Sequence, residues 1–146
     1  AGLDLSGSRS SSLASGFFVW SLDEEGGVIN RCSDEILDPR MPTCGSSITL
    51  DTNNEFVAIG FADLNTVLVW RLNGTSAPKF HSRITGKSSE FFGFGSTVAF
   101  EIIDGHLLLL VSSSGSSLLP KYGSIVFYYY DRSTDSFERQ LGRIPR

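Results

Sequence analysis

Histidine and cysteine, which supply most of the nucleophilic, acid–base and zinc chemistry of proteins, are scarce in this sequence. It has two histidines, His81 and His106, and two cysteines, Cys32 and Cys44. The closely spaced pairs of Cys or His that bind zinc are missing, and no serine lies in the Gly-x-Ser-x-Gly pattern of a hydrolase elbow. The sequence therefore predicts no catalytic residues, no metal and no cofactor, and a protein that is not an enzyme.

Excess positive charge and long apolar runs are also lacking. The chain has 12 Lys and Arg against 16 Asp and Glu, and its net charge of −4 would repel a nucleic-acid backbone. Apolar runs such as Leu107–Val111 have the length of a strand and not of a membrane span. The first residues show neither an initial Met nor the layout of a signal peptide. We therefore expect no nucleic-acid partner and no membrane span, and either a targeting segment already removed or a piece of a longer chain.

Two features bear on the compartment. Cys32 and Cys44 lie on either side of Pro39 and Pro42 and could close a small loop as a disulfide, or remain two buried thiols. Asn73 begins the glycosylation sequence Asn-Gly-Thr, although Asn-Gly is equally a good hairpin turn. Together they favour an extracellular or organelle-lumen location without deciding it.

Short runs of aromatic and β-branched residues alternate with turn-forming residues along the whole chain, as expected for β-strands. Strands are predicted at residues 16–23, 28–32, 45–50, 55–61, 66–73, 79–84, 95–100, 106–111, 123–131 and 137–142. Residues 33–44 and 86–95 are expected to be connections. The small residues Ala58 and Gly60 suggest close packing against their strand, and His81 is expected to face solvent.

The chain also repeats itself. Residues 45–50 match residues 95–100 at an offset of 50, and Trp70 precedes its counterpart Tyr128 by 58 positions. Trp20 precedes Trp70 by 50 positions, and residues 3–23 are similar to the second and third strands of the later copy. A period of about 50 residues with four short strands is typical of propeller blades or a related β-array.

The order of motifs in residues 94–130 resembles the FG-GAP repeats of integrin-type β-propellers. Phe94-Gly95 precedes an alternating strand, an apolar strand ends near Ser113, and a Gly opens the Tyr-rich strand 123–130. The resemblance implies an all-β fold of antiparallel four-stranded propeller-like blades, about two and a half repeats of about 50 residues, and thus an incomplete propeller. Another repeated β-sheet array is the alternative. The division is residues 1–44 as a partial blade and linker, 45–94 as the second blade and 95–146 as the third.

The family's calcium loop would fall at residues 51–55 and 101–105. The second of these has Ile102 and Ile103 where ligands are needed, so no metal is expected there. The first, Asp-Thr-Asn-Asn-Glu, has acceptable spacing for calcium but is also an ordinary Asx-rich turn.

Aromatic residues recur at one position of the third strand. Since alternate residues of a strand share a face, Trp20, Trp70 and Tyr128 are each expected on the same face as Phe18, Leu68 and Val126. This face could be core packing between blades or an exposed platform for a sugar or a partner protein.

Two and a half blades cannot close a ring, so open faces and edges would remain. We expect a non-enzymatic structural or protein-interaction module that belongs to a longer chain or an assembly. Its partners would be other protein chains or the remainder of its own chain, and self-association is expected. The alternative is an extracellular carbohydrate- or ligand-binding propeller module.

Overall fold

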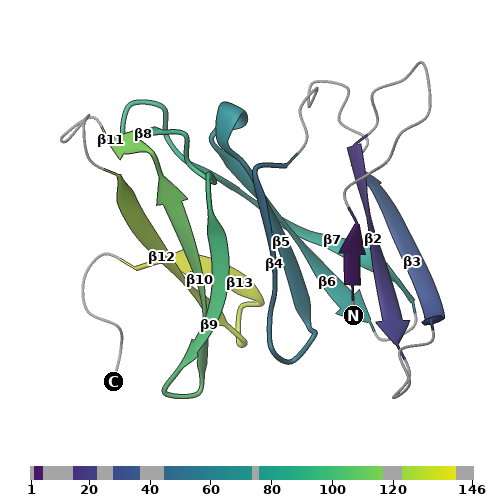
Figure 1. The fold of residues 1–146 in the computed structure, drawn as a ribbon. Coiled ribbons are helices and arrows are strands. Elements are labelled where there is room, and N and C mark those ends of the chain that lie inside the picture. Colours follow the sequence, from purple (N-terminus) through teal and green to yellow (C-terminus); the bar gives the residue numbers. More distant parts are fainter. Residues whose placement is uncertain are drawn as a thin grey trace. The chain divides into compact units, whose positions relative to one another are not determined.

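The computed structural model is all-β apart from a single short 3₁₀ turn among its described residues (Figure 1). It describes residues 2–4, 15–22, 28–36, 45–73, 76–116 and 123–140. The chain forms two compact units, residues 1–44 with 72–79, and residues 45–71 with 80–146. Because the 3₁₀ turn spans only Ala62–Leu64, no described helix could cross a membrane.

The first unit contains a three-stranded antiparallel sheet in the order β1 (Gly2–Asp4), β2 (Ser15–Leu22) and β3 (Val28–Ile36). The predicted hairpin is confirmed, but β3 is longer than predicted. β2 begins one residue earlier than predicted, at Ser15, which pairs with Ile36, and residues 33–36, assigned to a connection, belong to β3. If residues 3–23 followed the later copy, Leu3 would pair with Trp20, as Leu109 pairs with Tyr128. Leu3 pairs instead with Val19, so the first strand is shifted by one residue.

Two four-stranded antiparallel sheets lie in the second unit, except for residues 72–79 at the end of β6 and the start of β7. We call the first the β4–β7 sheet: β4 (Ser47–Leu50), β5 (Phe56–Phe61), β6 (Thr66–Asn73) and β7 (Ser76–Thr85). We call the second the β9–β13 sheet: β9 (Val98–Ile103), β10 (His106–Ser113), β12 (Ser124–Asp131) and β13 (Ser136–Arg139). The all-β, four-stranded prediction is therefore confirmed. These two sheets, as described, do not make a closed ring.

One strand pair was not predicted. β8 (Phe91–Phe92) lies in the segment assigned to a linker and pairs with β11 (Gly115–Ser116), which lies in a Ser/Gly-rich segment assigned to a loop. Two-residue strands carry no periodicity of their own, because alternation needs a longer run to be visible.

The pairing registers show that the two four-stranded sheets are equivalent residue by residue. Three directly paired positions in the β4–β7 sheet are Leu50, Val57 and Trp70, and their counterparts in the β9–β13 sheet are Phe100, Leu109 and Tyr128. The first strands are thus offset by 50 positions and the third strands by 58, as the sequence repeat predicted.

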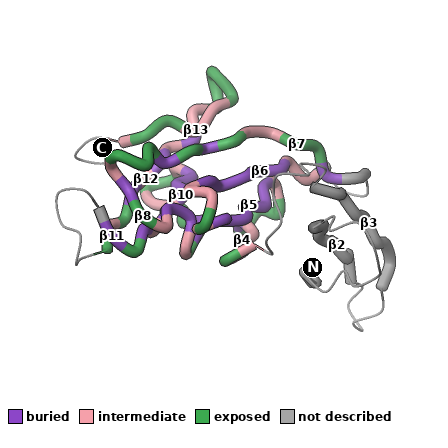
Figure 2. The backbone as a smooth tube through the Cα atoms, turned by 90° about the horizontal axis from the view of Figure 1, so that it is seen from above, coloured by how far each residue is buried: buried purple, intermediate pink, exposed green. Residues whose placement is uncertain are grey.

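Each sheet has one face toward the other, and we call these the inner faces. The buried cluster between them is formed mainly by alternate residues of β5, β6, β9, β10 and β12, among them Phe56, Ala58, Val67, Val69, Val98, Phe100, Leu109, Val126 and Tyr128. Figure 2 shows the buried residues of β5, β6 and β10 along the middle of this unit. The predicted close approach at Gly60 is confirmed, because a Cβ there would lie 2.0 Å from the carbonyl oxygen of Gly95.

The inner faces of the two sheets carry different positions of the repeat. In the β4–β7 sheet the inner face carries Ala58 and Val69, whereas Val57 and Trp70 point to the opposite, outer face. In the β9–β13 sheet it is Leu109 and Tyr128, the counterparts of Val57 and Trp70, that point inward. The sheets are therefore stacked head to tail, with the inner face of one corresponding to the outer face of the other.

Candidate functional site

The outer face of the β9–β13 sheet is apolar and partly open to solvent. The register of β10 with β12 places Leu110 beside Phe127 and Leu108 beside Tyr129, and alternation adds Ile125 to the same face. Ile125 is 58% exposed, Leu110, Phe127 and Tyr129 are half-buried, and Leu108 is fully buried. Single exposed apolar residues are ordinary, but a contiguous group on one sheet face is characteristic of an interaction surface.

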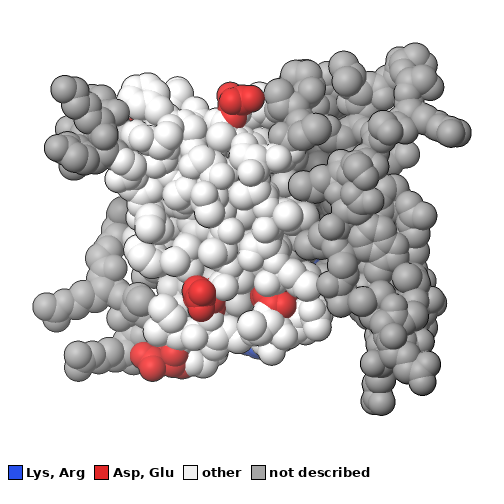
Figure 3. All heavy atoms as spheres, viewed as in Figure 1, with Lys and Arg blue, Asp and Glu red and all other residues white. Residues whose placement is uncertain are grey.

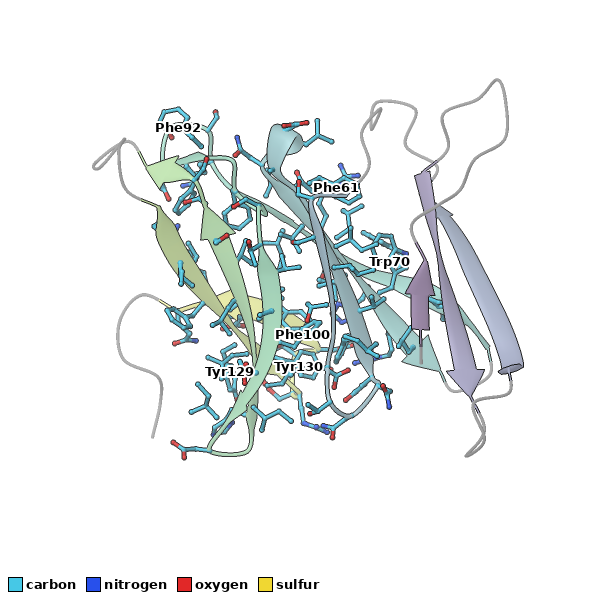
Figure 4. The ribbon with its side chains drawn as sticks, viewed as in Figure 1. Phe61, Trp70, Phe92, Phe100, Tyr129 and Tyr130 are labelled. Carbon is cyan, nitrogen blue, oxygen red and sulfur yellow. The ribbon has the colours of Figure 1, made fainter. Side chains whose placement is uncertain are left out.

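The aromatic residues of β12 alternate between the two faces. Figure 4 shows Phe100 and Tyr130 between the sheets and Tyr129 on the other side of β12. The Tyr129 hydroxyl lies 3.2 Å from Nδ1 of His106, and the two rings are 5.2 Å apart in an edge-on arrangement. The polar end of Tyr129 is thus held, while its ring remains part of the apolar surface.

Acidic residues lie at two margins of this outer face. Glu101 on β9, Leu108, Tyr129 and Glu138 on β13 are paired in one row across the sheet, and both glutamates are exposed. An apolar centre with a charged rim is the usual anatomy of a protein interface.

A second feature is a polar cluster that joins the two sheets at one end. The carboxylate of Asp135, in the turn between β12 and β13, accepts hydrogen bonds from the Tyr130 hydroxyl at 2.7 Å and from two Arg71 nitrogens at 2.8 and 3.1 Å. Nε2 of His81 lies 3.0 Å from the same carboxylate. Arg71 lies on β6 and His81 on β7, so Asp135, in a turn of the β9–β13 sheet, contacts two strands of the β4–β7 sheet.

The charges within this cluster balance each other. Hydrogen bonds from Tyr130, Arg71 and His81 hold the pKa of Asp135 well below its usual range, and the bond to Asp135 raises the pKa of Arg71. Arg71 also lies 4.8 Å above the Phe56 ring and 3.7 Å from Glu55. A bidentate Arg–carboxylate pair over an aromatic ring is rigid, so the cluster fixes the relation of the two sheets.

The prediction that His81 faces solvent is wrong. Its side chain is 8% exposed and packs edge-on against Phe56 at 5.3 Å and Phe137 at 5.7 Å. The ring can be buried because both nitrogens have partners, Asp135 at Nε2 and the Ser82 hydroxyl at Nδ1, 3.1 Å away. The order Ser82–His81–Asp135 is superficially that of a hydrolase triad, but Arg71 already neutralises the carboxylate that would support the histidine.

The turn at residues 51–55 uses its acidic side chain for the backbone. Asp51 is buried, and its carboxylate accepts hydrogen bonds from the backbone N–H groups of Asn53, Glu55 and Phe56 at 3.2, 2.7 and 2.7 Å. These bonds close the β4–β5 turn. Within the described ranges, no group of three or more His, Cys, Asp or Glu is placed to hold a metal ion.

The aromatic residues singled out in the sequence occupy equivalent positions but do not form one surface. Trp70 is 3% exposed, points away from the β9–β13 sheet in Figure 4, and packs edge-on against Phe80 at 5.9 Å. Tyr128 is 7% exposed and lies in the cluster between the sheets, where burial raises its pKa. Trp20 lies on β2, and its side chain is outside the described residues.

The remaining candidates lie where no side chain is described. Cys32 is on β3 and Cys44 falls outside the described residues, so their disulfide stays a prediction. Asn73 ends β6, and its side chain and the two residues after it are likewise outside, so glycosylation stays a prediction too.

The surface on which β4 and β9 lie nearest the viewer is mostly uncharged. Figure 3 shows acidic groups toward its ends and hardly any Lys or Arg among the described residues on that side. Such a surface offers no basic stripe for a nucleic-acid backbone.

Sequence reasoning missed both the outer apolar face and the polar cluster. The apolar character of this face could have been found, since Ile125, Phe127 and Tyr129 alternate with Val126 and Tyr128 along one strand. The cluster could not, because Arg71 and Asp135 are 64 positions apart and carry no local motif. No protein-family model matches the chain, and no curated protein matches it with significance.

Proposed function

We propose that this chain is a non-enzymatic structural and protein-interaction module, built of propeller-like repeats and belonging to a larger chain or assembly. The observation that carries the proposal is the head-to-tail stacking of two equivalent sheets. An inner face bearing Ala58 and Val69 packs on an inner face bearing Leu109 and Tyr128, although these are opposite faces of the repeat.

Head-to-tail stacking has a direction, and this supports an array over a finished two-sheet sandwich. When unlike faces of equivalent units meet, each added unit presents the same free face as the one before it. Such contacts continue until a ring closes, as in a propeller, or extend as an open stack. Two four-stranded sheets are too few to close a ring, so the proposal implies a further sheet on the outer face of the β9–β13 sheet.

The engagement of the histidines supports a non-enzymatic role. Both ring nitrogens of His81 have side-chain partners, and Nδ1 of His106 lies within hydrogen-bonding distance of the Tyr129 hydroxyl. A general base must also be within reach of a substrate, and the His81 side chain is only 8% exposed. The arrangement of these side chains instead suits the support of neighbouring strands.

The proposal is tested by the association state of the purified chain. Light scattering at increasing concentration should give a mass that rises above that of the 15.9 kDa monomer, because a partly exposed apolar sheet face favours association. A mass that stays at the monomer value over the whole soluble range would contradict it.

The alternative, an extracellular carbohydrate- or ligand-binding module, has one observation in its favour. Phe127 and Tyr129 are partly exposed on the outer face and could stack on a sugar ring. Trp70 and Tyr128 are buried and are poorly placed for this role. A monomeric chain that binds on a glycan array, and loses that binding on Tyr129→Ala without unfolding, would favour the alternative.

A further inference from the structure

We infer that the outer face of the β9–β13 sheet binds a second copy of this chain, head to tail, through the side of β2 that carries positions 18 and 20. This rests on the proposed function and goes further, because it names the surface, the partner and the direction of assembly. The face is defined by Leu110, Ile125, Phe127 and Tyr129.

The chain already contains one example of the contact that we propose. Ala58 and Val69 on the inner face of the β4–β7 sheet pack on the aromatic-centred face of the next sheet. The registers place Leu110 and Phe127 at the counterparts of Ala58 and Val69, at offsets of 52 and 58. The outer face of the β9–β13 sheet is therefore equivalent to the inner face of the β4–β7 sheet, which is covered by the next sheet of the chain.

The chemistry of the outer face fits an apolar sheet as its occupant. Ile125 is 58% exposed at one end of the apolar group, where it pairs with Ser112, and the exposed Glu101 and Glu138 lie at the two edge strands. A flat apolar centre bounded by charges excludes water from the middle of a contact and keeps the rim soluble.

The complementary face is supplied by the same sequence. In the contact already present in the chain, the aromatic-centred face is the one that carries Tyr128. The equivalent position is Trp70 in the β4–β7 sheet and Trp20, 50 positions earlier, on β2. Because residues of a strand alternate between faces, Phe18 and Trp20 on β2 are expected to share that face. The sequence thus predicts that a second copy offers an aromatic-centred face of the required kind, which an unrelated partner would have to reproduce.

The surface is tested by Ile125→Lys, which places a charge at its most exposed apolar position. Sedimentation velocity of the full chain should show association weakened at least tenfold, since an unpaired ammonium would be buried in the contact. Phe92→Lys is the matched control, because Phe92 on β8 is 51% exposed and outside this face, and it should associate like the wild type. Ile125→Thr keeps the branched side chain and should give an intermediate effect.

The direction is tested by mixing Ile125→Lys with an excess of the wild type. In head-to-tail assembly the variant still occupies the outer face of a wild-type chain but cannot be extended, so it shortens the assemblies. In a symmetric contact between two outer faces the variant would be excluded, and the wild type would form a discrete dimer.

The outcomes separate this inference from the proposed function. Wild-type association that Ile125→Lys leaves unchanged, or a discrete dimer that the variant does not cap, would overturn the inference while an interacting module remains. A wild type that is monomeric at every concentration would overturn both. Unchanged circular dichroism of both lysine variants shows that loss of association is not loss of fold.

Discussion

Asp135 makes polar contacts with residues of both four-stranded sheets. Its carboxylate is hydrogen-bonded to Tyr130 on β12, Arg71 on β6 and His81 on β7. The residue adopts a left-handed backbone conformation with φ of 53°, which asparagine also tolerates. Asparagine at this position therefore removes the charge without forcing the turn to change.

Asp135→Asn is expected to lower the melting temperature at neutral pH and to flatten its dependence on acid. The pKa of Asp135 is lowered in the folded state, so its stabilisation is present above the unfolded pKa of about 4 and is lost as the pH falls toward the folded value. The difference in melting temperature between wild type and variant should therefore stay constant from pH 7 to about pH 4 and shrink progressively as the pH falls further.

Asp104→Asn is the matched control for this titration. Asp104 is an exposed carboxylate in the β9–β10 turn, with a similar φ of 51°. Because this side chain is exposed, its replacement should leave the melting temperature at pH 7 close to that of the wild type. A difference between wild type and Asp135→Asn that stays constant below about pH 4 as well would show that the charge of Asp135 is not what joins the sheets.

Gly60→Ala is expected to destabilise the chain although it adds only one methyl group. The new Cβ would lie 2.0 Å from a backbone oxygen of Gly95, and a backbone atom cannot move aside as a flexible side chain can. Overpacking of this kind costs roughly 1–3 kcal/mol in the free energy of unfolding, measured by urea titration.

Gly105→Asn separates this clash from the general effect of losing a glycine. Gly105 has φ of 79° in the Asp104-Gly105 turn, and a Cβ there would meet no atom within 4 Å. Asparagine is among the residues that adopt this conformation most readily, so the change should cost only about 1 kcal/mol, from the positive φ alone. Equal costs at Gly60 and Gly105 would mean that the sheets do not approach each other closely.

At the scale of elements, the two faces of the β9–β13 sheet should differ sharply in their response to truncation. Leu109 on the inner face is fully buried, so Leu109→Ala should cost about 2–5 kcal/mol by leaving a cavity between the sheets. Ile125→Ala on the outer face should cost less than about 1 kcal/mol, because most of that side chain is already in water. Chemical denaturation of dilute protein measures both, and equal costs would show that the faces have been assigned wrongly.

The long strands of this protein could be predicted from the sequence because their patterns are local. β6 and β12 combine β-branched and aromatic residues over eight positions each, between turn-forming residues. β8 and β11 could not be predicted, because each is two residues long and exists only through its pairing with the other. His81 was misassigned for a related reason, since the carboxylate that allows its burial comes from Asp135, 54 positions later.

At the scale of the whole molecule, the repeat could be read from the sequence but the direction of stacking could not. Trp70 and Tyr128 mark the same position in two sheets, and the pairing registers confirm their offset of 58. Which face of each sheet meets the other is decided by packing, because β5 and β6 are apolar on both faces and show no polar side to turn outward. The sequence places Ile125, Phe127 and Tyr129 on one face of β12, but only the arrangement of the sheets makes that face the outer one.

The forces that hold the assembly together should appear in its response to temperature and salt. If the apolar group around Ile125 and Phe127 forms the centre of the contact, association should weaken in the cold, where the hydrophobic driving force declines, and strengthen in sodium sulfate. Sedimentation velocity of the wild type under these conditions measures both effects.

Sodium chloride should not dissociate the assembly, because a desolvated apolar contact has no charge for it to screen. Association that strengthens in the cold and disappears in moderate sodium chloride would instead place the binding energy in the charged rim of Glu101 and Glu138.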